Sequence, residues 1–110
     1  MDAERARRLA LNEAVVREVN EAVEQIAADW FESDEPVEFR CECADADCEE
    51  RISILRAEYA RVREDPARFV VAPGHEDLGL ERIVRDLRVA RVVEKIGPAR
   101  DVAEETAPGG

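Results

Sequence analysis

Several signatures of catalysis and of membrane insertion are missing from this sequence. No apolar run is long enough to cross a membrane as a helix, and the first residues lack the apolar segment of a signal peptide. A glycine-rich phosphate loop and a serine elbow are also missing, and His75 is the only histidine. Hydrolase and kinase chemistry therefore have no recognisable basis in this sequence. From the lack of a membrane-spanning run and of a signal segment, we expect a cytoplasmic protein.

Aromatic residues are scarce, at 5% of the 110 residues, whereas charged residues make up 39%. This composition predicts a small apolar core beneath a charged surface. The formal net charge of -11 repels phosphate groups, so we expect no nucleic-acid or membrane partner. Lys95 is the only lysine beside many arginines, which together with abundant alanine and glutamate is typical of a bacterial genome rich in G and C.

The three cysteines, Cys41, Cys43 and Cys48, all lie in one short stretch. An odd number of closely spaced cysteines fits reduced, metal-bound thiols in a cytosol better than a disulfide framework. With His75, which follows a predicted type II turn at Pro73-Gly74, they make up the ligand set of a closed Cys₃His zinc site. We therefore expect one Zn²⁺, and a structural role for it, since four protein ligands leave no position for water.

Two other interpretations of the cysteines remain open. They can be buried small hydrophobes, with His75 an exposed turn residue. Alternatively, Cys43 and Cys48 can form a disulfide with Cys41 as the resolving thiol. The neighbouring acidic residues raise thiol pKa values, which argues against a reactive thiolate. The same acidic residues lack the glycine and the ordered spacing of a calcium-binding loop.

Residues 1–33 predict an amphipathic helix without glycine or proline, and Ser33-Asp34-Glu35-Pro36 ends it. Apolar residues in steps of three and four form a seam, in which Asn12 is polar and which Val15 and Ala22 widen. The seam packs either on the chain's own sheet or on a second copy or partner helix. Its candidate partner-binding residues are Leu9, Val16, Val19, Val23, Ile26 and Trp30.

Residues 37–97 predict a small domain. Alternating apolar residues indicate strands over 37–43 and 50–54, and a helix follows over 56–64. A third extended segment covers 69–71, and residues 80–86 and 89–96 predict a hairpin, although 80–87 also match a helix. We expect residues 98–110 to be a flexible acidic tail, with one possible helical turn over 101–106.

An ordered set of motifs runs through most of the chain. In sequence these are Phe39-x-Cys41-x-Cys43-x₄-Cys48, Arg51-Ile52, Glu58-Tyr59-x₂-Val62-Arg63-x-Asp65-Pro66-x-Arg68-Phe69, Pro73-Gly74-His75-Glu76, Glu81-Arg82-Ile83-Val84 and Val92-Val93-Glu94-Lys95. The set resembles that of a group of small bacterial proteins with no established activity. The resemblance implies that the cysteines and the Pro-Gly-His turn belong together, and it implies no substrate.

Together these patterns predict an α+β fold: a long N-terminal helix followed by a small antiparallel sheet with one helix, stabilised by a Cys₃His zinc site. The function we expect is that of a non-enzymatic, zinc-stabilised adaptor or regulatory module that binds another protein, or itself as a homodimer through the helix. A thiol-based redox or zinc sensor is the alternative, and a zinc-dependent enzyme is third.

Overall fold

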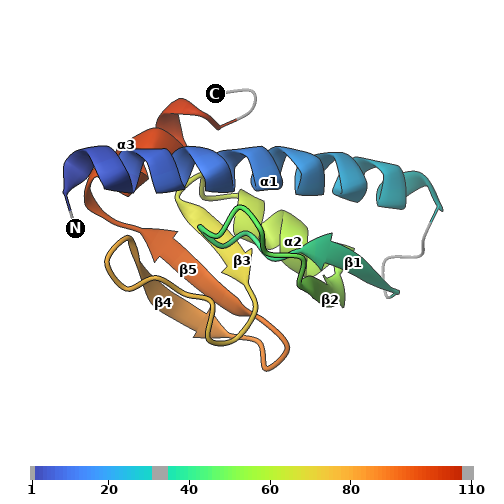
Figure 1. The fold of residues 1–110 in the computed structure, drawn as a ribbon. Coiled ribbons are helices and arrows are strands. Elements are labelled where there is room, and N and C mark those ends of the chain that lie inside the picture. Colours follow the sequence, from blue (N-terminus) through green and yellow to red (C-terminus); the bar gives the residue numbers. More distant parts are fainter. Residues whose placement is uncertain (1, 31–34, 108–110) are drawn as a thin grey trace.

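The computed structural model describes residues 2–30 and 35–107, and it has an α+β fold (Figure 1). The elements in chain order are α1 (Ala3–Trp30), β1 (Pro36–Arg40), β2 (Arg51–Leu55), α2 (Arg56–Arg63), β3 (Arg68–Val71), β4 (Glu81–Asp86), β5 (Arg91–Lys95) and α3 (Gly97–Glu105). The expected end of the first helix near residue 33, the first half of the linker over 33–36, and residues 108–110 of the expected tail lie outside the described residues.

The strands form two antiparallel sheets rather than one. In the first sheet β1 pairs with β2, and the period-two pattern buries Val37 and Phe39 on one strand and Ile52 and Ile54 on the other. In the second sheet β5 lies between β3 and β4. The pairing of β4 with β5 confirms the predicted hairpin, and the alternative of a helix over 80–87 is wrong.

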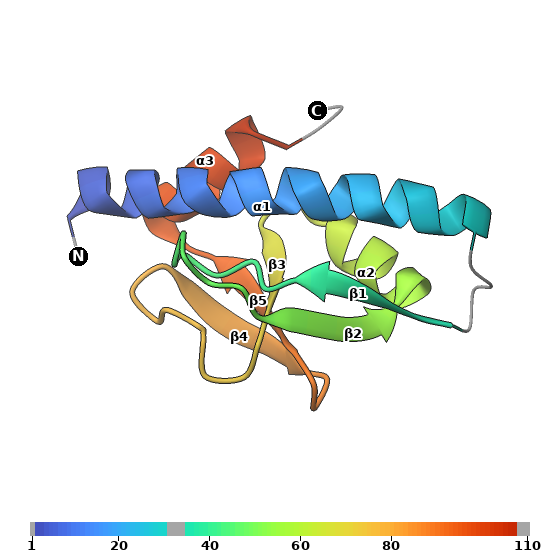
Figure 2. The ribbon, with the colours of Figure 1, turned by 45° about the vertical axis from the view of Figure 1, so that its right-hand side comes forward.

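Helix α1 lies across both sheets in the two ribbon views (Figures 1 and 2). Its 28 residues span about 42 Å at the α-helical rise of 1.5 Å per residue, close to the longest dimension of the molecule, 43 Å. The main core gathers residues from both sheets and α2, and a smaller cluster joins the first turns of α1 to α3 through Ala6, Ala10, Leu80, Ala99 and Val102.

The predicted seam of α1 does not match the face that the helix buries. The buried residues of α1 are Ala6, Ala10, Glu13, Arg17, Asn20 and Ala27. Leu9 and Val23 are partly buried against the two core clusters, whereas Val19, Ile26 and Trp30 are exposed, and so is Asn12. Of the two alternatives for the seam, packing on the chain's own sheet is therefore wrong for its outer half, and nothing in the single chain tests packing on a second copy or a partner helix.

Two buried polar side chains of α1, Glu13 and Arg17, help to explain why the helix turns this face inward. The Lys95 ammonium group donates hydrogen bonds to Glu13 and to Glu81, with all three side chains buried. Arg17 donates to the carbonyl oxygens of Pro66 at 2.8 Å and Ala103 at 3.2 Å. Buried polar groups are tolerated when they are paired, and the pairing partners come from the far end of the chain, so local periodicity cannot reveal them.

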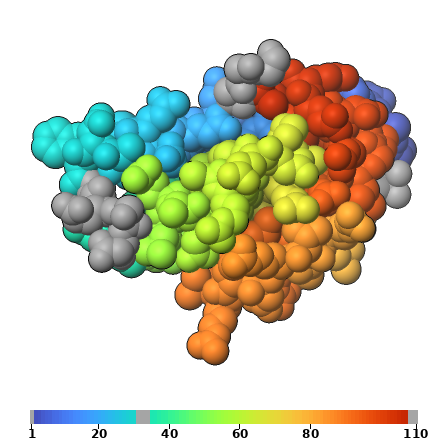
Figure 3. Space-filling view, turned by 180° about the vertical axis from the view of Figure 1, so that it is seen from behind, coloured from blue at the N-terminus to red at the C-terminus, as the bar shows by residue number. Residues whose placement is uncertain are grey.

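Residues 97–105 form helix α3, where the sequence analysis expected a flexible tail from residue 98. Pro98 lies in the first turn of the helix, where its missing N–H group costs nothing. Ala99, Val102 and Ala103 are buried, and α3 is visible in red on the back of the molecule (Figure 3). Burial of this apolar face stabilises helix α3 against the rest of the protein.

Across residues 2–30 and 35–107, none of the helices combines the length and hydrophobicity needed to cross a membrane.

Candidate metal centre

Cys41 and Cys43 follow directly after β1, which ends at Arg40, whereas the alternating pattern predicted a strand over 37–43 that includes both cysteines. The N–H group of Cys41 donates to the carbonyl oxygen of Glu50 at 3.0 Å, which continues the pairing of the first sheet beyond the strand. The N–H group of Glu42 instead donates to Val70 of β3 at 2.8 Å. The stretch therefore bridges the two sheets, and both thiols are buried, with exposed fractions of 3% for Cys41 and 4% for Cys43.

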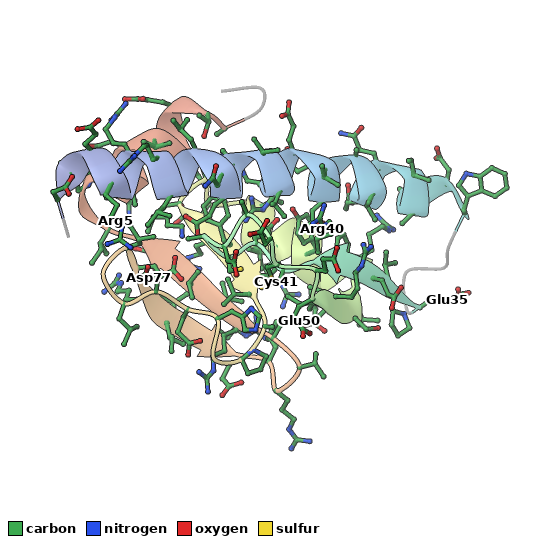
Figure 4. The ribbon with its side chains drawn as sticks, viewed as in Figure 1. Arg5, Glu35, Arg40, Cys41, Glu50 and Asp77 are labelled. Atoms are coloured by element: carbon green, nitrogen blue, oxygen red, sulfur yellow. The ribbon has the colours of Figure 1, made fainter. Side chains whose placement is uncertain are left out.

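The acidic loop returns the chain so that Cys48 approaches the other two thiols. Asp45 shapes the loop, because its carboxylate accepts the N–H of Asp47 at 2.9 Å and its carbonyl accepts the N–H of Cys48 at 3.1 Å. The Arg40 guanidinium donates to the Cys48 carbonyl at 3.2 Å. Arg40, Cys41 and Glu50 lie together beneath α1 (Figure 4).

His75 arrives from the turn that follows β3. Its N–H group donates to the carbonyl oxygen of Ala72 at 2.9 Å, and Gly74 has a φ of 89°. These are the features of a type II turn, in which the third residue needs a positive φ and glycine adopts it without strain. The predicted turn is therefore present, and it aims the imidazole ring at the thiols.

The four side chains come together as one cluster. One donor atom from each of Cys41, Cys43, Cys48 and His75 lies within 4.8 Å of the others. The Nδ1 atom of His75 is 3.6 Å from the Sγ of Cys41 and 3.5 Å from the Sγ of Cys48. Within the described residues this group could hold a metal ion, as the motif spacing predicted.

The thiols of the cluster differ in acidity. The hydrogen bond with the Cys41 thiol lowers the pKa of Cys43 to about 5, and His75 adds to this effect. The same hydrogen bond, together with burial, raises the pKa of Cys41. Burial also raises the pKa of Cys48. A cation bound at the cluster would favour the ionised form of each thiol.

A second, unpredicted feature lies between two of the candidate ligands. The side chain of Glu42 is fully buried, and both carboxylate oxygens accept hydrogen bonds. One oxygen accepts from the Tyr59 hydroxyl at 2.8 Å and from the Asn20 amide at 3.0 Å. The other accepts from the Val70 N–H at 2.9 Å and from Arg63 at 3.4 Å. Burial raises the pKa of Tyr59, so its hydroxyl keeps the proton that it donates.

This carboxylate connects the cluster to α1. Asn20 also accepts the N–H of Arg40 at 2.9 Å and donates to its carbonyl oxygen at 2.8 Å. It therefore pairs with the end of β1 as a neighbouring strand would. The only sequence signal for Glu42 was its place in the alternating strand, which assigned it to the solvent side. The chain leaves the regular strand at Arg40, and this change brings Cys41, Glu42 and Cys43 all into the interior.

The candidate partner-binding residues divide into two groups. Leu9, Val16 and Val23 are partly buried, with Leu9 and Val23 packed against the core clusters. Val19, Ile26 and Trp30 are exposed on the outer side of α1. Leu11 and Val15, which are not among the candidate partner-binding residues, are also exposed on α1.

No protein-family model, curated protein or solved structure matches this chain. The resemblance in the motif set thus has no identified family behind it. What the structure supports is narrower: the cysteine motif and the Pro-Gly-His turn form one Cys₃His cluster within an α+β fold.

Proposed function

We propose that this protein is a non-enzymatic, zinc-stabilised module of the cytoplasm that binds another protein, as an adaptor or regulator. The observation that carries the proposal is the convergence of three thiols and one imidazole, from two distant segments, on a single point. Three thiolates and one neutral histidine are a donor set typical of structural zinc.

Two of the distances between the donor atoms agree with zinc, and all the donor atoms lie within 4.8 Å of one another. With Zn–S bonds of about 2.3 Å and Zn–N bonds of about 2.0–2.1 Å, a tetrahedral ion separates sulfur from nitrogen by about 3.5 Å. The two distances from His75 to Cys41 and Cys48, 3.6 Å and 3.5 Å, agree with this value. The N–H group of Ala72 donates to the Cys41 sulfur at 3.2 Å, a contact that stabilises a thiolate ligand.

A structural role follows from the number of donors. Four protein ligands complete a tetrahedron, so an ion in this cluster would have no open position at which to activate water. The ion would instead join the end of β1, the acidic loop and the turn after β3. These segments belong to different sheets, so the metal would strengthen the contact between them.

The protein-binding part of the proposal rests on α1. Leu11, Val15, Val19, Ile26 and Trp30 are exposed large apolar residues, and we call them the α1 apolar row. A continuous row of this kind on a charged, acidic chain is an ordinary feature of protein-binding surfaces. The zinc site would keep the domain folded beneath the helix that presents the row.

The metal content tests the proposal directly. Elemental analysis of protein purified without chelator should find one zinc per chain, and X-ray absorption should show three sulfur ligands and one nitrogen ligand. Cys48→Ser and His75→Ala should each lose the metal. Glu49→Gln is the matched control, because Glu49 adjoins Cys48 and is exposed; it should keep the metal. Zinc-free wild-type protein would contradict the proposal.

A second candidate function is a redox or zinc sensor, and the partial exposure of Cys48 favours it. Cys48 is only partly buried and lines an open surface hollow together with Glu49 and His75. Hydrogen peroxide would oxidise the Cys43 and Cys48 thiolates to a disulfide, itself being reduced to water, and the zinc ion would leave. Zinc released in proportion to peroxide supports the sensor, whereas a structural site keeps its metal at the same dose.

A further inference from the structure

The α1 apolar row lies on the side of the helix that faces away from the protein. Its residues are spaced by three or four positions once the exposed Ala22 is included, so they share one face. The exposed fractions are large: 48% for Leu11, 62% for Val15, 43% for Val19, 60% for Ile26 and 79% for Trp30. In both ribbon views the two sheets lie on one side of α1 (Figures 1 and 2).

The row keeps a straight course along the helix. Leu11 and Ala22 are eleven residues apart, and so are Val15 and Ile26, and Val19 and Trp30. An eleven-residue repeat corresponds to about 3.67 residues per turn, close to the 3.6 of an unstrained helix. Two such helices can pack along their length with little supercoiling. Such straight packing is compatible with the fold, because the opposite face of α1 is bonded to the rest of the protein through Glu13, Arg17 and Asn20.

The charges of α1 are separated along its length. Residues 2–12 contain three arginines against two acidic residues, a net charge of +1, whereas residues 18–30 contain four acidic residues and no basic residue, a net charge of −4. Arg8 and Asp29 are both exposed on the same side of the helix as the row. No ion pair within residues 2–30 and 35–107 involves either of them.

The regular spacing of the row and the separation of charge along α1 together indicate which molecule packs against the row. A second copy of α1 in antiparallel orientation brings the positive end of each helix to the negative end of the other. A single register then places Leu11 opposite Ile26, Val15 opposite Ala22, and Arg8 opposite Asp29, with Val19 near the twofold axis. A parallel pair would instead place like charges together at both ends.

We propose that this protein forms a homodimer in which the α1 apolar row packs against the same row of a second copy, antiparallel, with Arg8 facing Asp29 of the partner subunit. The inference rests on the proposed protein-binding role of α1 and names the partner. Because the interface is isologous, each contact occurs twice, so single substitutions have doubled effects.

Sedimentation velocity and light scattering on the full, metal-loaded chain test the apolar part. The wild type should be a dimer, and Val15→Asp should be a monomer, because two carboxylates would be buried at the centre of the interface. Val89→Asp is the matched control: Val89 is 56% exposed in the loop between β4 and β5, against 62% for Val15. It should remain a dimer. Circular dichroism establishes that both variants are folded.

A charge exchange tests the orientation. Arg8→Glu and Asp29→Arg each replace two attractive pairs by two repulsive pairs in the antiparallel dimer, and each should weaken dimerisation about tenfold. The double variant should recover wild-type affinity, and an equimolar mixture of the two single variants should form the heterodimer. In a parallel dimer these pairs do not meet, so the absence of recovery in both experiments would overturn the antiparallel arrangement.

The wild-type protein alone can overturn the dimer itself. A monomer at every concentration up to the millimolar range would do so, since the row would then have a different occupant. The proposed function would not fail with it, because zinc content and coordination are measured independently of association. Conversely, a zinc-free dimer would refute the proposed zinc site and leave the antiparallel pairing intact.

Discussion

The side-chain amide of Asn20 donates to the carboxylate of Glu42 at 3.0 Å, and this bond joins α1 to the residue that lies between Cys41 and Cys43. The two residues that flank Glu42 in the sequence, Cys41 and Cys43, are candidate metal ligands, so the position of the Glu42 side chain depends on the geometry of the cluster. The docking of α1 and the integrity of the metal centre are therefore connected through a single buried carboxylate.

Metal removal should loosen the segment between residues 37 and 96. Zinc binding contributes to folding when its site does not exist in the unfolded chain, and the ligands here come from both ends of that interval. A strong chelator, or Cys48→Ser, should remove the cooperative thermal transition while part of the helical signal persists. Circular dichroism melts with and without chelator measure this. An equally sharp and equally high transition without metal would show that the cluster does not hold the fold.

Glu42→Gln should destabilise the protein by roughly 3 kcal/mol, because both carboxylate oxygens accept hydrogen bonds. Whichever way the amide turns, its NH₂ group faces a donor, either the Asn20 amide NH₂ or the Val70 N–H. Urea unfolding followed by Tyr and Trp fluorescence measures the loss. Glu50→Gln, at an exposed position in the same segment, is the control and should stay within about 0.5 kcal/mol of wild type.

Asn20→Ala should cost about 1–3 kcal/mol of unfolding free energy, since it leaves the N–H of Arg40 without its acceptor and removes a donor from Glu42. Asn12→Ala provides a matched control on the same helix, because Asn12 is exposed. That substitution should be neutral or slightly stabilising, as alanine has the higher helix propensity. Equal losses for the two variants would contradict the docking of α1 described here.

The stability of the protein should depend on pH through Glu13. Burial raises the pKa of this carboxyl group from 4.5 to about 8, although Lys95 opposes the shift. The folded chain therefore holds the proton more tightly than the unfolded chain does. This contribution to stability is complete below pH 4.5 and is lost as the pH rises through about 8.

Glu13→Gln removes that titration. The difference in unfolding free energy between wild type and Glu13→Gln should fall steadily from about pH 5.5 to about pH 8.5, as measured by urea denaturation. Using the difference cancels the pH dependence of metal binding, which both proteins share. Glu18→Gln, exposed on the same helix, should show no such trend. If the difference in unfolding free energy between wild type and Glu13→Gln does not change with pH, the raised pKa of Glu13 is refuted.

Local patterns in the sequence were sufficient for most of the elements. Alternation identified β1 and β2 because each strand buries one face, and the turn after β3 followed from Pro73 and Gly74. The cluster of Cys41, Cys43, Cys48 and His75 was predictable because few residues of the chain can bind a soft metal, and all of them are used. These features depend on residue type and short spacing.

The tertiary structure alone decided which face of α1 turns inward. Hydrophobic periodicity favoured the side with Val19, Ile26 and Trp30, yet the helix buries Glu13, Arg17 and Asn20. A buried polar or charged group is stable only with its partner, and the partners here, Lys95, Ala103 and Glu42, lie 82, 86 and 22 positions along the chain. The sequence by itself determined which segments are helices, strands and ligands. Only the folded chain, by bringing these distant groups together, determined which side of the long helix is buried and which side is exposed.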